Sequence, residues 1–169
     1  MPPAIIKGGM TQPTGYLRFI AENTPFLAAG ALLSLLSSFG QTFFISIFGG
    51  EIRSEFGLSN GDWGLLYMIG TTASAAVMVF AGGLADIFRV RTLGIAVVAM
   101  LALACLAMSF NTSVIGLVFV IFALRLMGQG MSSHMSGVAM SRWFIATRGR
   151  ALAIAGLGYM MGEATLPLI

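Results

Sequence analysis

Two charged residues stand inside long apolar stretches of this sequence. Arg125 lies near the middle of an apolar run from Val114 to Met140, and Glu163 lies in a second run further along the chain. A charge at the centre of a bilayer costs roughly 2.5–3.5 kcal/mol on insertion scales, so such a residue is normally turned inward, paired and functional. Since a planar guanidinium suits a carboxylate, Arg125 is a candidate for anion binding. Glu163 is a candidate for proton transfer.

The depth of the two residues makes a pair feasible. At 1.5 Å per residue, Arg125 lies about 17 Å and Glu163 about 20 Å from opposite ends of their helices. The two depths overlap in a hydrocarbon core about 30 Å thick. Three interpretations remain open. Arg125 binds the carboxylate of a substrate while Glu163 tunes it or carries a proton; the two form a static brace; or Arg125 pairs with a residue outside this chain.

A polar stripe surrounds Arg125. At 100° per residue, one helical face gathers the following residues: Arg125, Gly128, Gln129, Ser132 and Ser136. This stripe predicts one wall of a water-filled path, in which Gln129, Ser132 and Ser136 contact substrate.

The opposite side of the same helix carries His134. It lies nine residues from Arg125, or 180° away, with Gly130 and Gly137 nearer to its side. The two glycines predict a close-packing seam. His134 forms a hydrogen bond between helices in one interpretation and couples proton movement in the other.

A glutamine and a pair of glycines in other apolar runs are further candidate residues. Gln41 is the main polar residue of another apolar run, where it either bonds a neighbouring helix or lines a substrate cavity. Gly158 and Gly162 are spaced four apart, which predicts close packing of helix backbones.

Composition places these residues in a membrane protein. Of 169 residues, 57% are hydrophobic and only 9% charged, against about 25% charged in soluble domains. The basic residues are scattered at the ends of apolar runs, so no nucleic-acid partner is expected. A single cysteine excludes an internal disulfide framework. The sequence contains no phosphate-binding loop, metal-ligand cluster or hydrolytic triad, so we expect no enzyme activity, cofactor or metal.

The predicted fold is all-α, with five transmembrane helices. The spans are expected at 26–48, 63–85, 92–109, 114–140 and 151–169. Residues 1–25 form a polar tail with a short interfacial helix near 16–21. Pro25 is expected in the first turn of the first span, and Gly49-Gly50 at its end.

Basic residues predict the orientation. Seven of the nine lie in the tail and in the loops on the same side of the membrane: Lys7, Arg18, Arg89, Arg91, Arg142, Arg148 and Arg150. By the positive-inside rule the N-terminus is cytoplasmic and the 51–62 segment lies outside. We expect a multi-pass plasma-membrane protein, in a bacterial inner membrane. Because the fifth span is still apolar at the last residue, the chain is expected to be a fragment of a longer protein.

Three motifs resemble those of the major facilitator superfamily. After the second span, Gly82, Asp86 and Arg91 match the family's loop pattern, from which Ile87, Arg89 and Thr92 depart. The segment 125–130 (RLMGQG) resembles the family's fourth helix. The segments 142–153 and 158–163 resemble the loop and fifth helix of its monocarboxylate and organic-anion members.

This resemblance implies helices one to five of an expected twelve. It implies a secondary active transporter that moves a small solute by alternating access, here an organic anion with proton coupling. In the family the loop at Gly82, Asp86 and Arg91 latches the two halves on the cytoplasmic side; here it is either such a latch or only an orienting turn. We expect Asp86 to have a cationic or helix-N-terminal partner.

The implied partners are the lipid bilayer, the solute and a C-terminal half of the same protein. The alternative from another class is a non-transporting membrane subunit, with a similar half fold that serves structure or assembly of a larger complex.

Overall fold

The computed structural model describes residues 15–168 and is helical throughout, with no strand in that range. Residues 1–14 of the predicted tail and Ile169 of the fifth predicted span lie outside the described part. Five helical segments are long and apolar enough to cross a membrane: Tyr16–Ile47, Asn60–Ile87, Val90–Phe110, Val114–Trp143 and Arg148–Leu168. The all-α membrane fold is therefore confirmed.

Several spans consist of more than one helix. The first contains α1 (Tyr16–Ser37), the 3-10 turn η1 (Ser38–Gly40) and α2 (Thr42–Ile47), and α3 (Gly49–Phe56) follows it. The second contains α4 (Asn60–Ala81) and α5 (Leu84–Ile87), and the third is α6 (Val90–Phe110). The fourth contains α7 (Val114–Leu124), the π-helix η2 (Arg125–Ser132) and α8 (Ser133–Trp143). The fifth contains α9 (Arg148–Thr165) and the turn η3 (Leu166–Leu168).

The first helix begins earlier than predicted. It starts at Tyr16, so the expected interfacial helix is part of α1, and Pro25 lies inside α1 rather than in a first turn. Proline lacks the N–H that would bond the carbonyl of Ala21. The Thr24 hydroxyl donates to that oxygen at 3.3 Å and to the Ile20 oxygen at 2.8 Å. These bonds explain how the helix continues past a residue that normally ends or kinks it.

The connection between the first two spans is also helical. Gly49-Gly50, expected as a terminator, begins α3 instead. The helix ends at Gly57, the one described residue with positive φ (62°), a conformation that costs glycine least. Ser59 then caps α4 through a reciprocal bond with Asp62, so the second span starts at Asn60, three residues before the predicted 63.

Helix α1 is packed on two sides. Gly158 of α9 lies so close to α1 that an added methyl group would overlap the carbonyl of Ala31, and one at Gly162 would overlap the Ser38 hydroxyl. The Gly158 and Gly162 spacing is therefore a close-packing motif, as predicted. Without a hydrophobic driving force between helices in lipid, such contact supplies much of their association.

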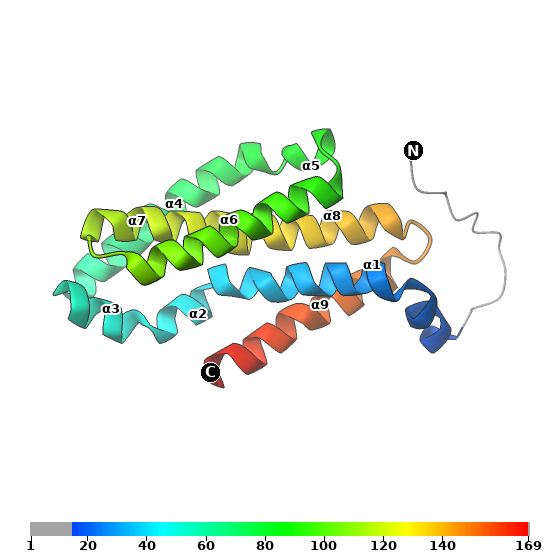
Figure 1. The fold of residues 1–169 in the computed structure, drawn as a ribbon, viewed down its shortest axis with the longest axis horizontal. Coiled ribbons are helices and arrows are strands. Elements are labelled where there is room, and N and C mark those ends of the chain that lie inside the picture. The colour runs from blue at the N-terminus through cyan, green and yellow to red at the C-terminus, as the bar shows by residue number, and fades with distance from the viewer. Residues whose placement is uncertain (1–14, 169) are drawn as a thin grey trace.

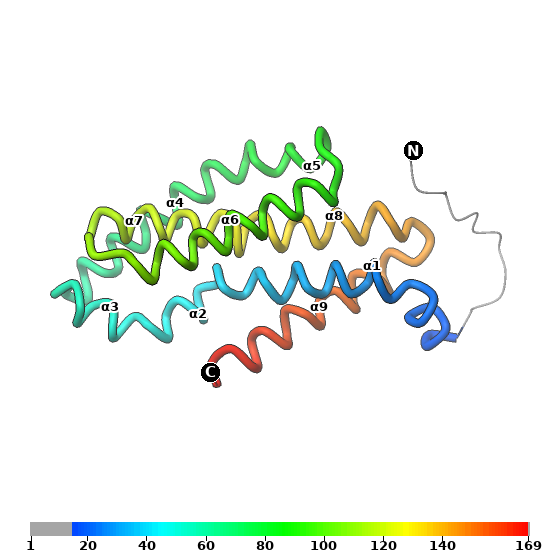
Figure 2. The backbone as a smooth tube through the Cα atoms, in the orientation of Figure 1, coloured from blue at the N-terminus to red at the C-terminus, as the bar shows by residue number. Residues whose placement is uncertain are grey.

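The other side of the first span contacts η2 through two glycines. A methyl group on Gly128 would lie 2.6 Å from the Gly40 Cα, and one on Gly40 would collide with the carbonyl of Leu124. The chain breaks at this point, because Gln41 is extended (φ −80°, ψ 152°). Figure 2 shows the backbone stepping sideways between α1 and α2 at the break.

The two ends of the bundle differ in charge. The start of α1, α5 and the connection from α8 to α9 lie at one end, and α3 lies at the other (Figure 1). The first end carries Arg89, Arg91, Arg142, Arg148 and Arg150 with Asp86, whereas α3 carries Glu51 and Glu55 with the single Arg53. Large exposed side chains between the ends, such as Leu103 on α6 (57% exposed), suit contact with lipid.

The packing of α9 on α1 predicts the effect of two matched substitutions. Gly158→Ala inserts a methyl group against the Ala31 carbonyl and is expected to destabilise the folded protein by about 1–3 kcal/mol, as overpacking does. Gly156→Ala on the same helix meets no atom within 4 Å and should not destabilise it. Thermal unfolding of the purified variants in detergent measures both. Equal melting temperatures for the two variants would contradict the close contact.

Candidate functional site

Arg125 is buried at the junction of three spans. Its side chain is 9% exposed, and its Nη1 donates to the Gly40 carbonyl at 3.2 Å and to Thr42 Oγ1 at 3.0 Å. The Tyr67 hydroxyl of α4 donates to the same Thr42 oxygen at 3.0 Å. The Tyr67 ring also lies under the guanidinium, 5.6 Å from Cζ to the ring centroid, which suits a cation–π contact.

The broken first span explains why the guanidinium lies there. The chain turns extended at Gln41, so the carbonyl of Gly40 ends η1 without a continuing helix. The C-terminal end of a helix carries partial negative charge and favours a cation. The Gly40–Gly128 contact brings η2 near enough for Arg125 to reach this carbonyl. The arginine therefore caps the break.

The predicted brace between Arg125 and Glu163 does not form. Glu163 is exposed on α9, beside Gly162. The ion pairs within residues 15–168 are Arg18–Glu22 and Arg142–Asp86. Among the described residues, the charge of Arg125 is therefore met by neutral oxygens and an aromatic ring, and no carboxylate compensates it.

Two serines of the polar stripe, which was expected to line water, are buried. Ser136 is 2% exposed and bonds both the Gly30 carbonyl and the Ser34 hydroxyl of α1 at 2.8 Å. Ser132 is fully buried and donates to the Met127 carbonyl, five residues back in its own π-helix. Ser136 therefore joins α8 to α1, whereas Ser132 bonds within its own helix, and both are packed inside this bundle.

Some buried side-chain polar atoms of the described residues have no hydrogen-bond partner. Within the described residues, the four such atoms are Arg125 Nε, Gln129 Oε1, Thr71 Oγ1 and Ser38 Oγ. Thr71 is one turn beyond Tyr67 on α4, which packs on η2. Buried polar groups are nearly always hydrogen-bonded in proteins, so the unpartnered Nε of Arg125 has capacity for one further acceptor.

The side chain of Gln41 makes no interhelical hydrogen bond within the described range. Gln41 is partly exposed at the break, and its backbone carbonyl accepts the Ile45 N–H at 3.2 Å. Neither interpretation of its side chain is decided.

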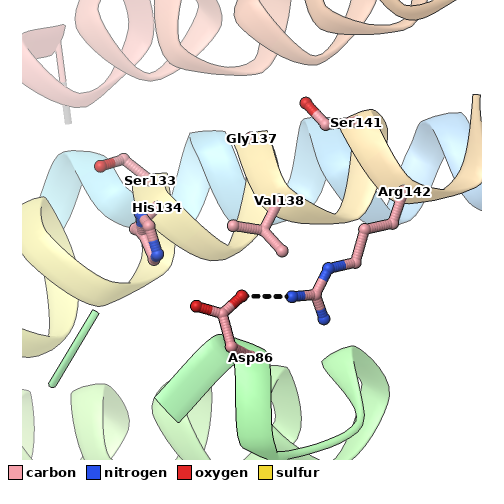
Figure 3. A pocket seen from close by; sticks show the side chains of 7 residues that line it. All are labelled: Asp86, Ser133, His134, Gly137, Val138, Ser141 and Arg142. Atoms are coloured by element: carbon pink, nitrogen blue, oxygen red, sulfur yellow. Dashed lines mark hydrogen bonds and ion pairs between the residues drawn. The ribbon is translucent and has the colours of Figure 1, made fainter. Parts of the chain in front are cut away.

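A second cluster lies at the arginine-rich end. Arg142 of α8 donates to Asp86 Oδ1 at 2.7 Å and to the Ala85 carbonyl at 2.6 Å. Asp86 therefore has the cationic partner expected for it. One ring nitrogen of His134 lies 3.3 Å from the Gly82 carbonyl, a contact between helices of the kind that the first interpretation of His134 expects. Figure 3 shows Asp86 and Arg142 facing each other across a pocket of about 370 Å³, which His134 also lines.

Three residues near this cluster differ in role. Gly130 faces α4, where an added methyl would lie 3.1 Å from the Met78 sulfur, as a packing seam requires. Gly137 borders the pocket, and no atom of residues 15–168 lies within 4 Å of such a methyl, so it packs against no helix in that range. Arg91 is exposed in the first turn of α6, outside the Asp86–Arg142 pair.

The comparison with protein families identifies the fold's family. The sequence model of the Major Facilitator Superfamily matches residues 30–169. The chain belongs to this superfamily. A search of curated proteins and a search of solved structures each found no match.

Members of the Major Facilitator Superfamily are transporters, so the chain is part of a multi-pass membrane transporter family. This membership does not favour the alternative of a non-transporting subunit. Residues 15–168 contain no group of three or more His, Cys, Asp or Glu side chains placed to hold a metal ion.

Three site residues were missed by sequence reasoning. Tyr67 and Thr42 hold the guanidinium of Arg125, and Arg142 holds Asp86. The available signals were the hydroxyls of Thr42 and Tyr67 inside apolar spans and the arginine at the end of the fourth span. No local pattern connects them, because the two hydrogen-bond acceptors of Arg125, Gly40 and Thr42, are more than 80 positions earlier in the chain.

The Arg125 contacts predict the behaviour of Thr42 variants. Thr42→Val keeps the shape but removes the oxygen that accepts from Arg125 and Tyr67. A hydrogen bond to a charged group contributes about 1.5–3 kcal/mol, so the variant should lose stability of that order. Thr42→Ser retains the oxygen and should unfold at a temperature close to that of the parent protein. Thermal unfolding in detergent compares them, and a Val variant as stable as the Ser variant would rule out this role.

The Asp86–Arg142 pair predicts a small energetic coupling. Its side chains are 82% and 41% exposed, and exposed pairs contribute about 0–1 kcal/mol. A double-mutant cycle of Asp86→Asn and Arg142→Gln, measured by thermal unfolding, should give a coupling in that range. A coupling several times larger would show that the pair stabilises the fold rather than a conformation of the transporter.

Proposed function

We propose that this chain belongs to a secondary active transporter that moves a small organic anion by alternating access, driven by protons. The proposal places Arg125 at the anion's carboxylate and Glu163 as the proton carrier. Gln129 and Gln41 are polar contacts of the same site. The chain contributes helices one to five and works with a C-terminal half of the same protein.

The buried charge of Arg125 is the observation that supports an anionic substrate. A buried charge without compensation is costly. No carboxylate within residues 15–168 pairs with Arg125, and its Nε has no hydrogen-bond partner there. A substrate carboxylate would neutralise the charge and accept the unused N–H, and the guanidinium fork suits two parallel bonds to it.

The surroundings of Arg125 provide an approach for such a ligand. Thr42 is exposed and Tyr67 is partly exposed, so the network around the guanidinium reaches the surface of this half. Tyr67 and Thr42 can also exchange hydrogen bonds with a bound carboxylate. A substrate carboxylate and a carboxylate from the C-terminal half are the two sources of compensation that this geometry leaves open, and the first is our proposal.

Glu163 supports proton coupling through its position. It is an exposed carboxyl inside an otherwise apolar span, one residue from the contact of α9 with α1. His134 is a second titratable candidate, at the opposite face of the fourth span from Arg125.

The charge asymmetry of the bundle supports the orientation. The arginine-rich end is proposed to face the cytoplasm, with the N-terminus, in a plasma membrane of the bacterial inner-membrane type. The loop at Gly82, Asp86 and Arg91 then lies at the cytoplasmic surface. We propose that the Asp86–Arg142 pair holds this loop to α8 as part of a latch between the halves, with the exposed Arg91 free to contact the other half.

Transport by the full-length protein tests the two roles separately. Arg125→Lys keeps the charge but loses the fork, and is expected to reduce both proton-driven uptake and substrate exchange across the membrane. Glu163→Gln should abolish accumulation against a gradient but leave exchange of labelled for unlabelled substrate. The substrate for these assays is first identified by a thermal-shift screen of organic anions on the full-length protein.

The amount of folded protein in the membrane is the control for both variants. Intact transport per folded molecule in Arg125→Lys would overturn anion binding by Arg125. Accumulation by Glu163→Gln equal to that of the parent would overturn the proton role of Glu163.

A further inference from the structure

A second cavity lies at the end of the bundle opposite the arginines. It measures about 430 Å³ and is lined by residues from η1, α2, α3, α6 and α7, most of them apolar. Ligand sites in proteins typically have about 300–1,000 Å³, apolar walls and a few placed polar groups. This cavity has all three features, and the proposed function does not use it.

Its apolar wall is aromatic. The rings of Phe39 and Phe44 pack edge to face at 5.2 Å between centroids, and those of Phe44 and Phe48 at 5.3 Å. All three phenylalanines line the cavity. The faces of aromatic rings attract cations.

Two carboxylates stand at the same cavity. Glu51 and Glu55 are four residues apart on α3, so they project from one face of the helix, and both are exposed and line the cavity. The nearest basic side chain along the helix, Arg53, is engaged elsewhere, by the Gly49 carbonyl and the Asn60 side chain. Neither carboxylate forms an ion pair within residues 15–168.

We propose that this cavity binds a small lipophilic ammonium compound, with the apolar body against the phenylalanines and the ammonium group at Glu51 and Glu55. The walls select for an apolar body of limited size, and the uncompensated negative charge selects for a cation over a neutral or anionic molecule of the same shape. The site is separate from Arg125, because Gly40, Thr42 and Tyr67 do not line this cavity.

Cys105 allows a direct measurement of whether a ligand occupies the cavity. It is the single cysteine of this sequence, is partly buried and lines the cavity. A ligand in the cavity should shield its thiol from a maleimide. Labelling is followed by mass spectrometry of the peptide that contains Cys105, on the full-length protein in lipid nanodiscs.

Three compounds of one shape make the test specific. 1-Adamantylamine is cationic at neutral pH, 1-adamantanol is neutral, and 1-adamantanecarboxylate is anionic. The amine should slow labelling about fivefold at a concentration about four times its dissociation constant, because binding leaves one part in 1 + [L]/Kd free. The alcohol and the carboxylate should protect far less.

The combined variant Glu51→Gln, Glu55→Gln removes the charge and keeps the size of both side chains. Its labelling without ligand should match the parent, and the protection by the amine should be lost. Glu22→Gln is the control, because Glu22 is an exposed carboxylate on α1 that does not line the cavity. Protection by the amine should persist in that variant.

Equal protection by all three compounds would overturn the proposal, because the cavity would then hold any apolar body, a lipid chain included. Absence of protection by the amine, or its persistence in the double variant, would also overturn it. The three compounds on the parent protein decide the question even if the double variant alters labelling without ligand. The outcome is independent of anion transport, since no step of it involves Arg125.

Discussion

The contact between the backbones of Gly40 and Gly128 is the constraint on which the fold of this chain depends. No side chain separates the first span from the fourth there, so the two helices approach as closely as their backbones allow. Both helices are irregular at the contact, one broken and extended at Gln41 and the other wound as a π-helix. A carbonyl is left free on one side, and a guanidinium is brought within reach of it on the other. Helix packing and site geometry therefore have one origin.

Small residues extend this arrangement along the first span. Lipid chains are as apolar as the helices, so association in the membrane relies on close van der Waals contact and on polar bonds between helices. Gly158 and Gly162 supply the contact with α9, and Ser136 supplies bonds to α1 from α8. The first span is thus held between the fourth and the fifth. Its broken segment, which carries Thr42, is held in place by helices on both sides.

Features that depend on local composition could be predicted from the sequence. Apolar length indicated five spans, glycine spacing indicated the α9 contact, and an acid after a helix end indicated a cation near Asp86. The remainder depends on contacts between distant segments. The break at Gly40 and the π-turns from Arg125 to Ser132 cannot be read from a period of 3.6, and the face assigned to Ser132 and Ser136 assumed that period. Pro25 was misplaced because Thr24 offers an alternative donor, which a positional preference does not consider.

The π-helix in the fourth span has a consequence for how this helix can vary. A π-turn is equivalent to an α-helix with an extra residue accommodated in the turn. Removal of one residue between Arg125 and Ser132 would restore regular winding and leave α7 and α8 in about their present relation, because the turn had absorbed that residue. The same removal from the regular helix on either side would rotate one part against the other by about 100°. Residues 125–132 are therefore where this helix can change its length while Arg125 at one end and His134 with Arg142 at the other keep their partners.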